Sequence, residues 1–333
     1  MSGFERVVIA GAGAFGTALA VVADKAGRRV TLFARDAAQA DAIAAARENV
    51  RYLPGVTLAP SIEITTNPEE FRSADLVLLA APAQATRAVA TMLAEKVPAG
   101  IPVVATAKGI EQASRKTQTE IIAEILPKAF PAALSGPGFA EEIARGLPTA
   151  VTIAAENLEL AHALSAALAT DTFRPYASDD LVGVELGGAI KNVLAIASGI
   201  VAGRLLGESA RAALIARGLA EMMRLGAALG ARAETFMGLS GLGDLVLTAT
   251  SRHSRNLAFG MALGEGRSAS ELLAAGMPLA EGAHTATVAA ELARHHAVDM
   301  PITAAVAEII AGRIGVEAAI EGLVSRPLKA ENA

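Results

Sequence analysis

The sequence contains no cysteine and no tryptophan, and aromatic residues make up only 3% of it. Without cysteine the chain can form no disulfide, no thiolate nucleophile and no cysteine-ligated zinc site, which fits a reducing compartment. No His-Glu-x-x-His motif occurs, and the five histidines lack the spacing of a metal site. We therefore expect no metal centre.

Long runs of positive charge are also missing. The chain has 29 Lys and Arg against 34 Asp and Glu, a net charge of −5. No basic cluster is long enough to follow a phosphate backbone, so we expect no nucleic-acid partner, whereas a small anionic ligand remains compatible. The amino terminus has neither a basic n-region nor an apolar h-region of useful length, which predicts an unexported protein.

One segment, residues 181–203, is long and apolar enough to imitate a membrane span. It carries Glu185 and Lys191 near its centre and five glycines. Each central charge costs about 2.5 to 3.5 kcal/mol to insert into a bilayer. A buried core helix is therefore expected, with no stable membrane insertion.

What is abundant is apolar surface: 53% of the 333 residues are hydrophobic and only 19% are charged. At roughly 100 to 200 residues per domain, this length predicts about two domains. In the first half, short apolar runs alternate with helical patterns, as in a mostly parallel sheet with crossover helices. The expected strands are residues 6–10, 29–34, 76–80, 102–107, 132–135, 149–154 and 173–176.

After about Ser178, extended runs almost vanish and helical spacing continues to the carboxyl end. Ser178, Asp179 and Asp180 are candidate caps for the helix that opens this second half. The sequence thus predicts an α/β Rossmann-type dinucleotide-binding domain over residues 1–180. An all-α substrate and catalytic domain follows over residues 181–333. The expected helices include residues 15–26, 37–49, 83–95, 158–169, 209–229, 256–263, 282–296 and 302–311.

A glycine motif, Gly11-Ala12-Gly13-Ala14-Phe15-Gly16, directly follows the first expected strand and opens the first expected helix. In this context Gly11 allows a tight turn, Gly13 lets the backbone approach a pyrophosphate, and Gly16 allows close helix packing. The free N–H groups of the helix attract the phosphates. The alternative is a glycine-rich turn with no ligand.

Arg35 follows the second expected strand, at the place where NAD-selective sites carry a carboxylate. A guanidinium there pairs with a 2′-phosphate, so NADP(H) is favoured, with NAD(H) possible. The alternative is a surface arginine, with Asp36 binding the ribose.

Lys191 lies in the most apolar expected helix, beside Gly187, Gly188 and Asn192. Partial burial disfavours the charged form of a lysine and suits it to proton transfer. We identify Lys191 as the candidate general acid and base. The alternative is a lysine that covers apolar surface with its stem and extends its ammonium to water.

Three further charged residues are candidates for the same site. Lys108 follows an expected strand of the parallel sheet, whose carboxyl edge binds ligands, although a solvated loop lysine would look the same. Asp244 is either an N-cap or a partner that orients Lys191. Arg255 is either a surface cation or the ligand of a substrate phosphate. We take Lys191, Asp244 and Lys108 as the candidate catalytic residues.

Over nearly the whole chain, the sequence resembles the bacterial NAD(P)-dependent glycerol-3-phosphate dehydrogenases. The lysine, aspartate and arginine segments are the specific part of this resemblance. The similar segments are residues 11–20, Ala107-Lys108-Gly109, Ser135-Gly136-Pro137, residues 187–193, residues 216–221, residues 241–245, Ser254-Arg255-Asn256 and Glu281-Gly282.

The resemblance implies a cytoplasmic oxidoreductase, commonly a dimer, that interconverts dihydroxyacetone phosphate and sn-glycerol 3-phosphate for glycerophospholipid synthesis. It implies that the cofactor is bound by Gly11, Gly13, Ala14, Phe15, Gly16, Arg35, Lys108, Ala140, Arg255, Leu279 and Glu281. It implies that the substrate is bound by Lys108, Gly136, Gly138, Lys191, Asn192, Asp244, Thr248, Ser254, Arg255 and Asn256.

The chain departs from the family pattern at Gly138, and two alternative functions are compatible with the same sequence features. Many relatives carry Ser or Thr where this chain has Gly138, which predicts weaker substrate affinity and an unchanged reaction. A β-hydroxyacid or ketopantoate reductase would share the architecture and recognise a carboxylate in place of a phosphate. A catalytically silent nucleotide sensor would bind NADPH without turnover.

Overall fold

The computed structural model describes residues 3–274 and 280–328. Its contacts divide the chain into two compact units. The first, called here the α/β unit, comprises residues 1–188 and 230–244; the second, the helical unit, comprises residues 189–229 and 245–333. The sequence places its domain boundary at 180/181, where the long helix α7 (Leu181–Gly203) begins, and this helix contributes residues to both units.

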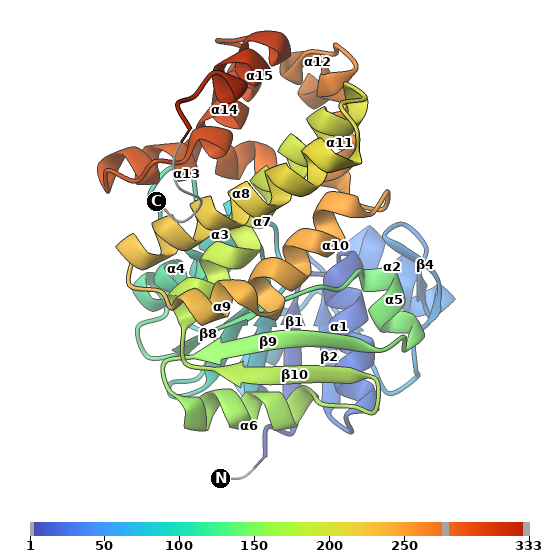
Figure 1. Ribbon diagram of the computed structural model, residues 1–333. Helices are drawn as coiled ribbons and strands as arrows, with labels where there is room; N and C mark the ends of the chain where they lie inside the picture. The colour runs from blue at the N-terminus through green and yellow to red at the C-terminus, as the bar shows by residue number, and fades with distance from the viewer. Residues whose placement is uncertain (1–2, 275–279, 329–333) are drawn as a thin grey trace. The chain divides into compact units, whose positions relative to one another are not determined.

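The α/β unit is built on an eight-stranded sheet of order β10-β9-β8-β7-β6-β1-β2-β5 (Figure 1). Neighbouring strands are parallel except for β8 and β9, which run antiparallel, so that the predicted mostly parallel sheet is confirmed. The strands of this sheet are β1 (Arg6–Ala10), β2 (Arg29–Phe33), β5 (Glu63–Thr65), β6 (Leu76–Leu79), β7 (Pro102–Ala105), β8 (Phe130–Ser135), β9 (Thr149–Ala155) and β10 (Phe173–Ser178).

Three strands have no counterpart among the predicted ones. β5 is a three-residue edge strand with no buried residue, and β3 (Glu48–Asn49) and β4 (Leu53–Thr57) form a separate antiparallel pair. Each is too short, or too exposed, to produce an apolar run or an alternating pattern in the sequence.

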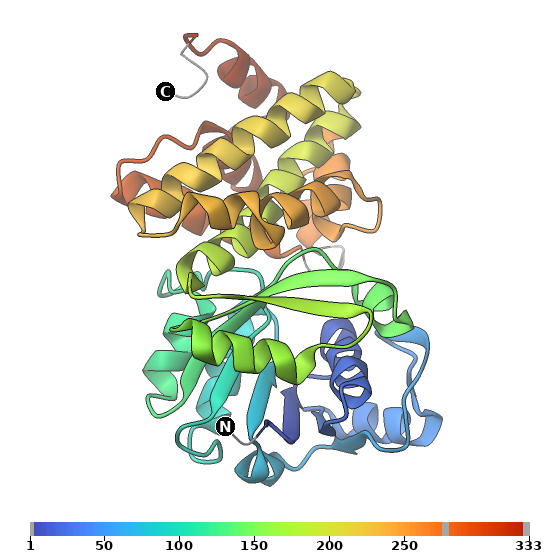
Figure 2. The ribbon, with the colours of Figure 1, turned by 60° about the horizontal axis from the view of Figure 1, so that its bottom comes forward.

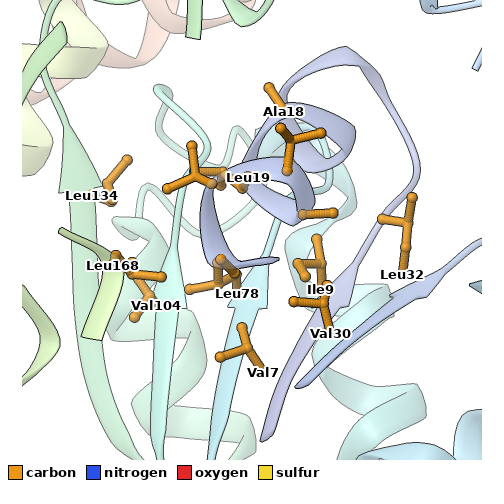
Figure 3. Packing of buried hydrophobic residues seen from close by; sticks show 14 of the residues in the cluster. Val7, Ile9, Ala18, Leu19, Val30, Leu32, Leu78, Val104, Leu134 and Leu168 are labelled. Carbon is orange, nitrogen blue, oxygen red and sulfur yellow. The ribbon is translucent and has the colours of Figure 1, made fainter. Parts of the chain in front are cut away.

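Apolar side chains cover both faces of the sheet, which explains why its strands read as nearly continuous apolar runs. Val7 and Ile9 pack on one face in one core cluster, while Val8 and Ala10 pack on the other face in a second cluster. Figure 3 shows the first cluster, in which Leu19 of α1 lies over Ile9 and Leu78. Figure 2 shows α6, in light green, in front of strands of the sheet.

The crossover helices of the α/β unit largely follow the predicted segments. They are α1 (Ala14–Lys25), α2 (Ala37–Ala46), α3 (Thr86–Leu93), α4 (Gln118–Ile125), α5 (Ala140–Arg145) and α6 (Leu158–Leu168), and the short α9 (Ala233–Met237) belongs to the same unit. The predicted helix 83–95 is a 3₁₀ turn at Ala83–Ala85 followed by α3. α4 was not predicted, although Thr117 and Glu120 form a capping box at its start.

The second half is helical throughout the part that the structure describes, as predicted. Its helices are α8 (Glu208–Ala228), α10 (Asp244–Thr250), α11 (Arg255–Gly264), α12 (Ala269–Ala274), α13 (Glu281–His295), α14 (Pro301–Ile310) and α15 (Val316–Val324). Asp180 caps α7 by accepting a hydrogen bond from the Gly183 N–H at 2.9 Å, as the sequence predicts.

Among the described residues, α7 is the one helix whose length and composition would allow it to cross a membrane. Its most apolar window is 89% buried inside the protein, so the predicted buried core helix is confirmed.

In the helical unit, α7 and α11 cross so closely that their backbones touch. Gly199 and Gly203 of α7 face Gly260 and Gly264 of α11, with the same four-residue spacing on each helix. A Cβ on Gly199 would overlap the carbonyl oxygen of Leu257, and one on Gly260 would overlap that of Ile196. The crossing therefore depends on the absence of side chains at these positions.

Candidate active site

The glycine turn between β1 and α1 forms a cradle whose three glycines have different surroundings. Gly11 has φ +124°, and a Cβ on it would lie 2.6 Å from the Ala80 carbonyl oxygen. A Cβ on Gly16 would overlap the Gly11 carbonyl oxygen, whereas a Cβ on Gly13 would meet no atom within 4 Å. Gly11 and Gly16 therefore serve packing, and Gly13 leaves open space at the amino end of α1, which fits a dinucleotide pyrophosphate.

Arg35 and Asp36, the two charged residues that follow β2, differ in their contacts. Asp36 caps α2, accepting a hydrogen bond from the Ala38 N–H at 3.0 Å. Arg35 is exposed and forms no ion pair or hydrogen bond with the residues that the structure describes. Its guanidinium thus remains available to an anion at this strand end, while the carboxylate beside it already has a structural partner.

Lys108 follows β7 and lies at the carboxyl edge of the parallel strands. Its ammonium donates to the Gly136 carbonyl oxygen and to Asp244 Oδ2, each at 2.7 Å. The side chain of Asp244 is 2% exposed and that of Lys108 is 17% exposed. Within the α/β unit the two predicted residues are therefore brought together, and Asp244 is the first residue of α10.

The loop that carries Lys108 is held by side chains on both sides of it. Gln118 donates to the Gly109 carbonyl oxygen and Gln84 donates to that of Ile110, each at 2.8 Å. Farther along, Arg87 forms an ion pair with the buried Glu111 at 2.9 Å. This hydrogen-bonded ion pair lowers the pKa of Glu111 below its ordinary value. The loop is thus fixed by interactions that do not use Lys108 itself.

Gly136 and Gly138 follow β8 and are needed for different reasons. Gly136 has φ +140°, and a Cβ on it would lie 2.8 Å from Val151 Cα. A Cβ on Gly138 would lie 2.9 Å from Ile143 Cδ1 and 3.2 Å from Thr149 Cγ2. The space beside Gly138 is therefore already filled by these two side chains.

Ala14, Phe15 and Ala140 are partly buried where α1 and α5 begin, and they pack on the core beneath the glycine turn. They supply apolar surface near the turn.

In the helical unit, Lys191 is buried, with 5% of its surface exposed. Its ammonium donates to Thr248 Oγ1 of α10 at 2.7 Å. This burial agrees with the placement of Lys191 in an apolar helix and differs from an ammonium extended to water. The hydroxyl orients the ammonium without adding a charge.

A second cluster in the helical unit lies at the amino end of α11. Asn256 donates to Asn192 Oδ1 at 2.9 Å and accepts from the Gly282 N–H at 3.0 Å. Ser254 caps the helix by accepting from the Leu257 N–H at 3.1 Å. Arg255, the first residue of the helix, is exposed. A fixed helix amino terminus with an accessible guanidinium is a suitable binding site for a phosphate.

Two of the predicted cofactor residues belong to the start of α13. Glu281 is the first residue of that helix. Leu279 lies outside the described residues.

The sequence alone did not identify Gln39 and Asn49, whose side chains donate hydrogen bonds to a carbonyl oxygen of the glycine turn. Gln39 Nε2 donates to the Ala12 carbonyl oxygen at 2.6 Å, and Asn49 Nδ2 donates to the same oxygen at 3.0 Å. Nothing in a single sequence marks Asn49, because it lies in a two-residue strand with no periodic pattern.

One partly buried and one buried carboxylate stabilise helix starts away from these clusters. Glu185 of α7 accepts from the Thr119 N–H at 2.9 Å, and Glu221 of α8 accepts from Ile302 N–H at 2.6 Å and Thr303 N–H at 3.0 Å. Burial raises the pKa of both groups. They act on α4 and α14 as helix caps.

A mostly parallel sheet with a glycine turn opening its first helix, in a chain whose helical unit buries a lysine, is typical of nicotinamide-dependent oxidoreductases. The comparisons specify it further. The family model described as NAD-dependent glycerol-3-phosphate dehydrogenase N-terminus matches residues 6–161, and the model of its C-terminus matches residues 180–321. The chain therefore belongs to the NAD-dependent glycerol-3-phosphate dehydrogenase family.

Individual relatives agree with this membership. The glycerol-3-phosphate dehydrogenase [NAD(P)+] of Bradyrhizobium sp. (strain ORS 278) is 57% identical over 328 residues, covering 98% of each chain. The crystal structure of glycerol-3-phosphate dehydrogenase from Coxiella burnetii is 38% identical, with a TM-score of 0.91, and the match covers 97% of this chain and 99% of that one. A ketopantoate reductase from Ralstonia eutropha is 19% identical, with a TM-score of 0.59 over 95% of this chain and 99% of that one, a likeness of fold alone.

Proposed function

We propose that the protein reduces dihydroxyacetone phosphate to sn-glycerol 3-phosphate, reversibly, with NAD(P)H as the hydride donor. Family membership supports the reaction. The observation that carries the mechanism is the burial of Lys191 with its ammonium held by the Thr248 hydroxyl.

In this mechanism Lys191 donates a proton to the oxygen of the substrate carbonyl as hydride reaches the carbon. The alkoxide is too basic to form without this charge compensation, and general acid help contributes about 10² to 10⁴ in rate. In the reverse direction the neutral amine of Lys191 removes the hydroxyl proton. The bound nicotinamide supplies only the hydride chemistry.

The remaining residues bind and position. Arg255, with Ser254 and Asn256 at the start of α11, holds the substrate phosphate, and Asn192 fixes Asn256. Lys108, Asp244 and the Gly136 carbonyl form a fixed polar group at the sheet edge that orients the polar end of the substrate. Gly138 contributes backbone groups alone.

The glycine turn, with Ala14, Phe15 and Ala140 beside it, binds the dinucleotide, and Arg255, Leu279 and Glu281 complete the cofactor set. We infer a preference for NADP(H), supported by the accessible Arg35 and by the use of Asp36 as a helix cap. NAD(H) is expected to be the weaker cofactor.

The cofactor preference has its own test. Arg35→Ala should lower kcat/KM with NADPH by about tenfold, because one charge-assisted contact to the 2′-phosphate is lost. The same variant should change kcat/KM with NADH by less than about twofold. Equal losses with the two cofactors would contradict the preference.

We further propose that the protein acts as a homodimer in the cytoplasm and supplies sn-glycerol 3-phosphate for glycerophospholipid synthesis. The family resemblance supports these expectations, and light scattering on the purified protein tests the oligomeric state.

The reaction is tested by mixing purified protein with NADPH and following nicotinamide absorbance. Dihydroxyacetone phosphate, ketopantoate and a β-ketoacid are supplied in parallel. We expect turnover with dihydroxyacetone phosphate at a kcat/KM far above that of either carboxylate. Preference for a carboxylate would indicate the related reductases, and NADPH binding without any turnover would indicate a nucleotide sensor.

A further inference from the structure

The side chain of Asn49 contacts the glycine turn through two hydrogen bonds. Asn49 lies in β3, is 1% exposed, and is 32 to 37 residues away in sequence from its partners in the turn. Its amide has two N–H donors, and both are used. One donates to the Ala12 carbonyl oxygen at 3.0 Å and the other to Thr17 Oγ1 at 2.7 Å.

These two hydrogen bonds reach two successive peptides of the turn. The Ala12 carbonyl is held directly. The Gly13 carbonyl accepts from the Thr17 N–H at 2.9 Å, as α1 begins, and also from the Thr17 hydroxyl at 2.8 Å, which is the hydroxyl that Asn49 orients. Gln39 adds a second donor to the Ala12 carbonyl at 2.6 Å.

Holding these carbonyls determines where the neighbouring N–H groups point. In a planar trans peptide the C=O and N–H bonds point in opposite directions. The Ala12 carbonyl shares its peptide with the Gly13 N–H, and the Gly13 carbonyl shares its peptide with the Ala14 N–H. Because Asn49 and Thr17 hold the carbonyls on one side, the two N–H groups are directed to the other side. The Gly13 N–H has no partner within residues 3–274 and 280–328.

Burying the side-chain amide of Asn49 costs folding free energy that packing alone would not offset. Asn49 Oδ1 is buried and has no hydrogen-bond partner among the described residues, and such an unsatisfied acceptor destabilises a folded protein. An apolar residue of similar size would avoid this cost but could not hold the carbonyls. The retained side chain is thus explained by its two donors.

We propose that Asn49 is a positioning residue for the cofactor pyrophosphate, which orients the Gly13 and Ala14 N–H groups through the Ala12 carbonyl and Thr17. Gln39 assists at the Ala12 carbonyl. This inference deepens the proposed function, because it rests on the glycine turn binding NAD(P)H.

The test compares Asn49→Leu and Asn49→Asp with the wild type by calorimetric titration with NADPH. Leucine removes both donors, and the aspartate carboxylate keeps the shape but presents acceptors to the Ala12 carbonyl. Both variants should raise the Kd for NADPH by about 10-fold to 100-fold, as expected from losing hydrogen bonds that fix the site. At saturating NADPH, kcat and the KM for dihydroxyacetone phosphate should change by less than about twofold.

A fragment comparison isolates the pyrophosphate. ADP-ribose contains the pyrophosphate, whereas adenosine 2′-monophosphate does not. The loss of affinity should appear with ADP-ribose and be absent with adenosine 2′-monophosphate. Equal losses for the two fragments would overturn the proposal in favour of a general disturbance of the unit.

Glu48→Ala is the matched control. Glu48 precedes Asn49 and accepts from the Gly55 N–H at 2.8 Å, so that it holds the β3–β4 pair without touching the turn. It should leave the Kd for NADPH within about twofold, and Thr17→Val should give a smaller loss than Asn49→Leu. If Glu48→Ala weakens binding as strongly as Asn49→Leu, the amide is not the cause.

The outcomes separate this inference from the proposed function. A wild type that binds NADPH but does not reduce dihydroxyacetone phosphate would refute the function and leave the titrations interpretable. A fully active wild type with unchanged NADPH affinity in Asn49→Leu would refute the role of Asn49 alone. Thermal unfolding of each variant confirms that folded protein is compared.

Discussion

In the α/β unit the proposed pyrophosphate site at the glycine turn is built of backbone, whereas in the helical unit the proposed substrate site is built of side chains. The geometry and the open space of the turn at Gly11, Gly13 and Gly16 depend on the absence of Cβ atoms there. The roles proposed for Lys191 and Arg255 depend on long side chains that extend from α7 and α11. The difference implies that the glycine turn is damaged by adding atoms, whereas the proposed roles of Lys191 and Arg255 are lost by removing atoms.

The largest effect is expected at Lys191. Lys191→Met preserves the length of the side chain and removes the proton donor, so that kcat should fall by about 10² to 10⁴. The Kd for NADPH should remain within about twofold, measured by calorimetry. Lys128→Met, at an exposed lysine before β8, is the matched control and should retain full activity. Full turnover in Lys191→Met would remove Lys191 from the mechanism.

Arg255→Ala tests the phosphate contact of the helical unit. We expect the KM for dihydroxyacetone phosphate to rise by about 10-fold to 100-fold, the usual cost of losing a hydrogen bond between charged groups. The KM for dihydroxyacetone, which has no phosphate, should change little. Arg252→Ala, at an exposed residue of the preceding turn, is the control. A similar rise for both substrates would indicate a role other than phosphate binding.

Gly16→Ala and Gly13→Ala make a matched pair in the glycine turn. At Gly16 the added methyl group overlaps the Gly11 carbonyl, so the free energy of unfolding should fall by about 1 to 3 kcal/mol. At Gly13 nothing lies within 4 Å, so stability should change by less than about 0.5 kcal/mol while NADPH affinity falls. Denaturant unfolding and calorimetry measure the two effects. If the two variants lost stability equally, the open space assigned to the cofactor would be wrong.

The smallest effects concern pH, where the loop that carries Glu111 and the start of α14 should respond in opposite directions. The pKa of Glu111 is lowered by Arg87, so its contribution to stability is present at neutral pH and is lost as pH falls through its folded pKa. The pKa of Glu221 is raised by burial. Its contribution is complete below the unfolded pKa of about 4.3 and is lost as pH rises through the folded pKa.

Hydrogen exchange, corrected for the intrinsic pH dependence, measures both effects. Protection of residues 106–117 should decrease toward acid, and protection at the start of α14 should decrease toward neutral pH. Glu111→Gln and Glu221→Gln should each flatten the response of their own region. A response of the same sign in both regions would contradict the assignment.

The sequence predicted the parts of the fold that have strong periodic signals. Strands buried on both faces, such as β6, and helices with caps, such as α7 behind Asp180, were found within a few residues. The short strands β3 and β5 left no pattern. The direction of each strand also could not be predicted from the sequence, because no local pattern shows that β9 runs antiparallel to β8.

The site residues divide in the same way. The glycine motif and Lys191 could be proposed from their local context. The contacts of Lys108 with Asp244, and of Asn49 with the turn, join residues 136 and 37 positions apart, and only the folded chain shows them. Long-range polar pairs of this kind have no periodicity to reveal them.

The glycine crossing of α7 and α11 limits how the substrate preference can evolve or be engineered. Lys191 lies on α7 and Arg255 lies on α11, and these two helices are in backbone contact. A larger residue at Gly199 or Gly260 would force the helices apart. The crossing therefore fixes the distance between the backbone positions of the proposed proton donor and the proposed phosphate ligand. Homologous ketones of other lengths should therefore be accommodated by changes of side chains on α7 and α11. The glycine contacts prevent one helix from sliding along the other.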